Sequence, residues 1–76
     1  MTAHKPDYAY AFNNRGISYK NLGRYDEAIA DYNRAIELNP DYAKAYRNRA
    51  SAYRAIGKPG KAKADEARAD ELEKKS

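Results

Sequence analysis

The sequence predicts an all-α protein made of two tandem helical hairpins. Nothing in the 76 residues alternates with the two-residue period of a β-strand. The chain repeats itself after roughly 34 residues, a period typical of stacked helical repeats. Each copy contains two segments with helical patterns, separated by a glycine. A chain of this length forms a single small domain, so a catalytic domain beside a regulatory one is excluded.

The repeat is clearest in Pro6-Asp7-Tyr8-Ala9, which returns as Pro40-Asp41-Tyr42-Ala43. The same offset relates further positions without a gap. The matched pairs include Asn14 and Asn48, Arg15 and Arg49, Tyr19 and Tyr53, Gly23 and Gly57, Ala28 and Ala62, Asp31 and Asp65, and Leu38 and Leu72. We therefore expect a flexible lead-in over residues 1–8 that reads like the end of a preceding repeat. A first unit over 9–42 and a second over 43–76 follow it.

The first unit holds two predicted helices. In residues 9–22, Phe12, Gly16, Tyr19 and Leu22 share one face, and Gly23 ends the helix because glycine adopts the left-handed conformation easily. In residues 26–38 the apolar stripe consists of Ala28, Ile29, Tyr32, Ala35 and Ile36. The Asn39-Pro40 pair ends this helix, since proline lacks the backbone donor and hinders a helical residue before it.

The second unit predicts helices over residues 43–56 and 59–74, and Pro59 suits a helix start. In the last helix Lys63, Glu66 and Asp70 stand where the first unit has Ile29, Tyr32 and Ile36. A polar face at these positions is what the terminal helix of a stack needs for solubility. We expect this helix to cap the array.

These residues resemble the tetratricopeptide repeat, whose signature is W-x2-L-G-x2-Y, then A-x3-F and P. Here it reads Phe12-x2-Arg15-Gly16-x2-Tyr19, Ala28-x3-Tyr32 and Pro40. The second copy reads Tyr46-x2-Arg49-Ala50-x2-Tyr53 and Ala62. The resemblance implies antiparallel helix pairs stacked as a short right-handed superhelix, with a concave groove lined by the first helix of each repeat.

The resemblance also implies which side chains face that groove. They are Tyr10, Asn13, Asn14, Ile17, Lys20 and Asn21 from the first helix, and Lys44, Arg47, Asn48, Ser51 and Arg54 from the third. The third helix contains no acid, whereas the acids of the second (Asp26, Glu27, Asp31, Glu37) are assigned to the outer face. A basic, amide-rich groove favours an extended acidic peptide. We expect a protein-protein interaction module or scaffold.

Some members of the family hold the C-terminal carboxylate of a chaperone in a clamp. Asn14 and Lys44 look like two of its members, but Asn48 stands where an arginine is expected. The clamp is therefore incomplete.

Simpler interpretations stay open for several of these residues. Lys44, Arg47 and Arg54 are also typical of a solvated helix face, and Asn14 and Asn48 of residues that join neighbouring helices. We expect Arg15 and Arg49 to lay their stems along the core and pair with acids. Tyr19, Tyr32, Tyr46 and Tyr53 are expected in the core, whereas Tyr10 points to the groove.

Other functions receive less support. The basic third helix and the calculated pI of 9.4 leave weak RNA binding as an alternative. No catalytic residue, cofactor or metal is expected, because His4 is the single histidine, cysteine is absent and no phosphate-binding loop is present.

A further alternative is a designed or truncated repeat protein without a natural ligand. Such a chain would self-associate as a homo-oligomer through an uncapped edge formed by Tyr8, Tyr10 and Phe12. No stretch is long enough for a membrane span, and we expect a cytoplasmic protein.

Overall fold

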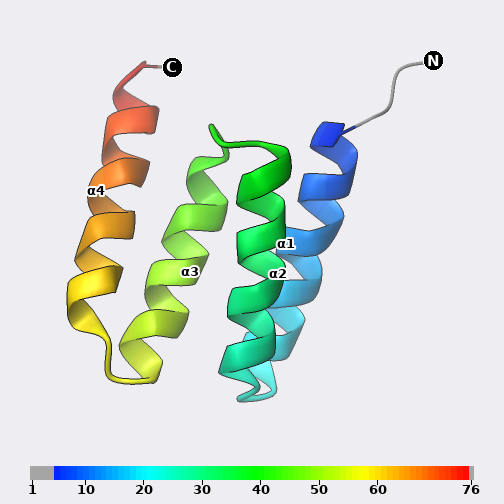
Figure 1. Ribbon diagram of the computed structural model, residues 1–76, viewed down its shortest axis with the longest axis vertical. Coiled ribbons are helices and arrows are strands. Elements are labelled where there is room, and N and C mark those ends of the chain that lie inside the picture. Colours follow the sequence, from blue (N-terminus) through cyan, green and yellow to red (C-terminus); the bar gives the residue numbers. More distant parts are fainter. Residues whose placement is uncertain (1–4, 76) are drawn as a thin grey trace.

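The computed structural model describes residues 5–75, which form four α-helices. They are α1 (Lys5–Asn21), α2 (Tyr25–Leu38), α3 (Ala43–Ala55) and α4 (Pro59–Lys75). Tight turns join successive helices at alternating ends, so that each helix runs antiparallel to the next (Figure 1). The predicted all-α repeat fold is confirmed. Within the described residues, no helix combines the length and apolarity that crossing a bilayer requires.

Helix α1 begins at Lys5 instead of at about Ala9. Residues 5–8, predicted as part of a flexible lead-in, are therefore helical, while residues 1–4 lie outside the described residues. The physical reason is the position of Pro6 in the first turn, where the donor that proline lacks would have no intrahelical partner. In the second copy Pro40, Asp41 and Tyr42 lie in the turn between α2 and α3, and α3 begins at Ala43.

Two glycines end the first helix of each hairpin as predicted. Gly23 and Gly57 have positive φ angles of 79° and 81°. After Gly23, the N–H of Arg24 donates to the carbonyl of Tyr19 at 2.8 Å, and Lys58 makes the same bond to Tyr53 at 2.8 Å. This hydrogen-bond pattern is the Schellman motif, which favours glycine at the left-handed position. Both hairpins therefore turn in the same way.

The core runs through the contact between the two hairpins. Helix α2 lies between α1 and α3 and packs against both (Figure 1). One cluster joins Ile29 and Tyr32 of α2 to Ala52 of α3. A second joins Ala9, Ala35 and Ala45, one from each of the first three helices. Because most buried positions are alanines, the helices approach closely, and few large side chains hold them together.

One close approach joins α1 to α2. Tyr32 is fully buried, and its ring lies against the backbone of Gly16. A Cβ atom added at Gly16 would lie 2.6 Å from Cε1 of Tyr32. In the second hairpin Ala50 stands in place of Gly16, and Glu66 stands in place of Tyr32. The helix that carries the larger alanine therefore faces a position without an aromatic ring.

An arginine-aspartate pair ties each hairpin together. Nε and Nη2 of Arg15 donate to Asp31 at 2.8 Å each, and those of Arg49 donate to Asp65 at 2.8 and 2.6 Å. Each guanidinium also lies between two aromatic rings, with centroids 5.5 to 5.7 Å away. The expected pairing of both arginines with acids is confirmed. The assignment of Asp31 to the outer face is wrong, because Asp31 is 5% exposed and accepts two hydrogen bonds from Arg15.

We expect Tyr32→Phe to stabilise the protein by about 1 kcal/mol, because the buried hydroxyl has no hydrogen-bond partner among the described residues. Burial also raises the pKa of Tyr32 to about 12, above its ordinary 10.0. The folded chain therefore favours the neutral phenol, and this preference is fully present below pH 10 and is lost as the pH rises through 12. Urea unfolding at pH 7 and pH 11 should show a larger advantage of the phenylalanine variant at pH 11. A variant less stable than the parent at both pH values would contradict this account.

Candidate functional site

The groove between α1 and α3 brings together most of the predicted site residues. A hollow of about 340 Å³ is lined by Tyr10, Asn13, Asn14 and Ile17 of α1 and by Lys44, Arg47 and Asn48 of α3. Tyr42 completes the lining. The two helices hold matching places in their repeats, so their inward faces align. Further along, Lys20 donates to the hydroxyl of Ser51 at 3.5 Å.

Three side chains form the floor of this groove. Asn13 is 3% exposed, and its amide nitrogen donates to the hydroxyl of Tyr42 at 3.3 Å. Its carbonyl oxygen accepts a hydrogen bond from the amide of Asn48 at 2.9 Å. Burial raises the pKa of the Tyr42 phenol above its ordinary 10.0. Asn13 and Asn48 therefore join the two hairpins, and a ligand meets a floor that is already hydrogen-bonded.

Two of the four cations predicted to line the groove are already paired with acids of α4. Nη2 of Arg47 lies 2.5 Å from Asp70 and 2.5 Å from Glu73. Arg54 pairs with Glu66 at 2.6 Å. The expectation of a strongly basic groove is therefore corrected: acids that the sequence placed on the outer, capping face reach across the hairpin and compensate most of the charge.

Lys44 lies at the mouth of the groove and, unlike Arg47 and Arg54, is not held by an acid of α4 among the described residues. It is exposed and makes no ion pair or hydrogen bond with the described residues. A neighbouring hollow of about 470 Å³ continues from it past Tyr10, Tyr42 and Asn39. Asn14 is also exposed on this side, and Tyr10 is 61% exposed. Lys44, an amide and an aromatic ring thus face the same open space, and Glu73, which pairs with Arg47, also lines it.

Two further predicted groove residues, Asn21 and Arg54, lie outside these hollows. Asn21 is exposed at the end of α1, outside the hollows that Tyr10 and Lys44 line. Arg54 lies in the last turn of α3 and is paired with Glu66 of α4. Tyr42, which precedes α3, was not among the predicted groove residues. The sequence shows it as the repeat counterpart of Tyr8, but its hydrogen bond to Asn13 depends on how the two hairpins stack.

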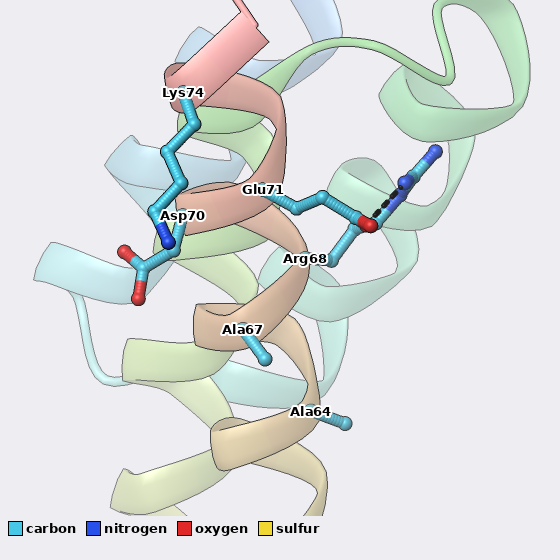
Figure 2. Close-up of a pocket in the computed structure, with 6 residues that line it drawn as sticks. All are labelled: Ala64, Ala67, Arg68, Asp70, Glu71 and Lys74. Carbon is cyan, nitrogen blue, oxygen red and sulfur yellow. Dashed lines mark hydrogen bonds and ion pairs between the residues drawn. The ribbon is translucent and has the colours of Figure 1, made fainter.

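A wider hollow of about 600 Å³ lies along α4, over Ala64, Ala67 and Lys74. Figure 2 shows its six lining side chains projecting from this single helix, with Arg68 and Glu71 paired to each other. Because one helix supplies the whole surface and its arginine is already paired, we do not take it as the site.

Acid should weaken the contact of α4 with α3. Hydrogen bonds from Arg54 and Arg47 lower the pKa values of Glu66 and Glu73 below their ordinary 4.5. Depressed values stabilise the fold above pH 4.5, and this contribution is lost as the pH falls through the folded-state values. Melting temperatures measured from pH 6 to pH 3 should therefore fall. Arg47→Gln should show a shallower decline, and an unchanged slope in that variant would contradict the assignment.

Four helices in two stacked hairpins, with a groove between the leading helices, define a helical-repeat scaffold. Family models for the tetratricopeptide repeat match residues 9–42 and 31–64. The chain belongs to the tetratricopeptide repeat family. Among curated proteins, none matches the chain.

Solved structures of MamA have the same fold. One MamA crystal structure superposes with a TM-score of 0.86 and 32% sequence identity, over 90% of this chain and 40% of that one. The structure called MamA MSR-1 C2 gives a TM-score of 0.84 at 31% identity, over 88% of this chain and 38% of that one. The chain thus spans less than half of the length of these MamA structures.

Proposed function

We propose that the groove between α1 and α3 binds an extended peptide segment of a protein partner, with an acidic group of the peptide at Lys44. The tetratricopeptide repeat is typically a non-enzymatic protein-interaction unit, and the MamA-like fold supports an interaction scaffold with protein partners. The observation that carries the proposal is the exposed Lys44, which forms no ion pair within residues 8–75, beside Asn14 and Tyr10 and over a floor fixed by Asn13 and Asn48.

Each of these groups has a matching function. An exposed asparagine amide offers both a donor and an acceptor to an extended backbone. The Lys44 ammonium attracts a carboxylate, either an acidic side chain or a C-terminus. The Tyr10 ring offers apolar area beside them. Because the pair at Lys44 is exposed and the surface is short, we expect modest affinity.

The paired arginines argue for a peptide over RNA. A ligand phosphate at Arg47 would have to compete with two carboxylates that already hold the guanidinium. RNA binding depends on several uncompensated cations and weakens steeply with salt. A peptide needs only the one carboxylate contact, with hydrogen bonds to its backbone supplying the rest.

The test is a binding screen of acidic peptides with free and amidated C-termini, followed by variants. Lys44→Ala should weaken a selected peptide by about 1.5- to 5-fold, the range expected for one exposed ion pair. Lys63→Ala is the matched control, since it removes the same charge from an exposed position on α4 and should change nothing. Amidation that weakens binding would place the C-terminus at Lys44.

Equal effects of Lys44→Ala and Lys63→Ala would overturn the proposal, as would the absence of any bound peptide. Stronger binding of single-stranded RNA, lost steeply with added salt, would favour the nucleic-acid alternative.

A further inference from the structure

The outward face of α1 is an uncovered copy of a face that is covered on α3. Ala45 of α3 is fully buried, and its counterpart Ala11 on α1 is exposed. Ile56 is half-buried against the core, whereas its counterpart Leu22 is 71% exposed. A closely similar sequence pattern, with Ser18 in place of Ala52, is therefore buried in one repeat and open to solvent in the other.

Arg15 on the open face is more exposed than its counterpart Arg49 and makes one hydrogen bond fewer with the described residues. The Arg49 side chain is 20% exposed, and that of Arg15 is 60% exposed, although both pair with a buried aspartate. Arg49 also uses its third nitrogen, Nη1, to donate to Asn33 of α2 at 2.8 Å. Nη1 of Arg15 makes no hydrogen bond with the described residues. It lies at the edge of a hollow of about 280 Å³ lined by Tyr8, Ala11, Phe12 and Arg15.

Helix α2 shows what fits such a face. Ile29 packs in one cluster with Ala52 of α3, and Ile36 packs on the cluster that contains Ala45. Asn33 lies between them in the sequence and accepts the hydrogen bond from Arg49. The pattern is an apolar residue, an acceptor four positions later and a second apolar residue three positions after that. This spacing keeps all three on one face of a helix.

We propose that the outward face of α1 docks an amphipathic helix of a protein partner that carries this pattern, with its central acceptor on Arg15. Ala11, Arg15 and Leu22 do not line the hollow between α1 and α3, so this contact is distinct from the peptide groove on the adjoining face of α1. The chain would then hold a helix on one face and an extended segment on the other.

A second copy of this chain fits the face poorly. In a head-to-tail pair, α4 would present Lys63, Ala67 and Asp70 where α2 presents Ile29, Asn33 and Ile36. Two of these would bury a charge against Ala11 and Leu22, and the alanine supplies no acceptor for Arg15. Figure 2 shows Ala67 and Asp70 on the outer surface of α4. Helix α2 of a second copy is already packed against its own α3.

The probe is a synthetic peptide of residues 24–39, held helical by a side-chain cross-link between the exposed positions 26 and 30. Added to the isotopically labelled chain, it should shift the amide signals of Ala11, Arg15 and Leu22 and leave that of Lys44 unchanged. A peptide with Ile29→Lys and Ile36→Asp, which copies α4, should not bind. Asn33→Ala in the peptide should weaken binding.

Variants of the chain complete the test. Ala11→Arg should weaken binding about tenfold or more by placing a large side chain in the contact. Ala30→Arg, the same change at an exposed position of α2, should leave it unchanged. Equal binding by both variants would overturn the proposal, as would no binding of the parent peptide. A dimer in sedimentation that Ala11→Arg dissociates would also overturn it and identify a second copy as the occupant.

Discussion

Replacing Arg49 with alanine is expected to lower the free energy of unfolding by about 3–5 kcal/mol, the usual cost of leaving a buried charge without its partner. The carboxylate of Asp65 is 7% exposed and accepts two hydrogen bonds from this arginine. The change also removes the bond to Asn33, which ties the second hairpin to the first. Urea unfolding followed by circular dichroism measures the loss. For a chain of 76 residues with about 0.05–0.15 kcal/mol of stability per residue, the total is about 4–11 kcal/mol, so this loss removes a large share of it.

Arg15→Ala is the internal control, because the repeat supplies the same pair in a different environment. Asp31 is as buried as Asp65, but the Arg15 side chain is 60% exposed and has no counterpart of the Asn33 bond among the described residues. Solvent screens its charge, so we expect a clearly smaller loss of stability. Equal losses of unfolding free energy in the two variants would show that the hydrogen bond from Arg49 to Asn33 and the greater burial of Arg49 contribute little.

The fold was predictable from the sequence because its strongest signals are local and repeated. Gly23 and Gly57 recur at the same offset, and both end a helix with a positive φ angle. The apolar stripe of α2 is buried as its period indicates. The start of α1 was not predictable in this way, since Pro-Asp-Tyr lies in a turn before α3 and within the helix in α1. The same three residues adopt two structures because their neighbours differ.

The candidate site was predictable as a set of positions and not as a distribution of charge. The repeat geometry that the resemblance implies placed Asn14 and Lys44 on one groove, and both line it. It did not show that Asp70 and Glu73 would reach Arg47, because pairing between helices depends on the angle of the hairpin and on side-chain rotamers. The position of Arg15 and Arg49 beside the packing face predicted their pairing with acids, but Asp31 was assigned to the outer face together with the other acids of its helix.

Gly16→Leu is expected to destabilise the protein by at least about 3 kcal/mol, at the upper end of the cost of overpacking a core. The first side-chain carbon alone would lie 2.6 Å from Cε1 and 2.8 Å from Cδ1 of Tyr32. The ring cannot move away easily, since Tyr32 is fully buried between α1 and α3. Gly16→Ala should give a smaller loss, because the helix propensity gained over glycine, about 1 kcal/mol, offsets part of the clash. Thermal and urea unfolding of both variants provide the measurement.

Gly60→Leu separates this clash from the general effect of removing a glycine. Gly60 lies in the first turn of α4, and a Cβ atom added there would meet nothing within 4 Å. The substitution should therefore leave stability unchanged or raise it by a few tenths of a kcal/mol through helix propensity. Similar losses at both glycines would contradict the steric explanation. If the clash is responsible, shrinking the ring should relieve it: Gly16→Ala should cost less in a Tyr32→Leu background than in the parent. The second hairpin already follows this rule, since it combines Ala50 with Glu66 and has no ring at the contact.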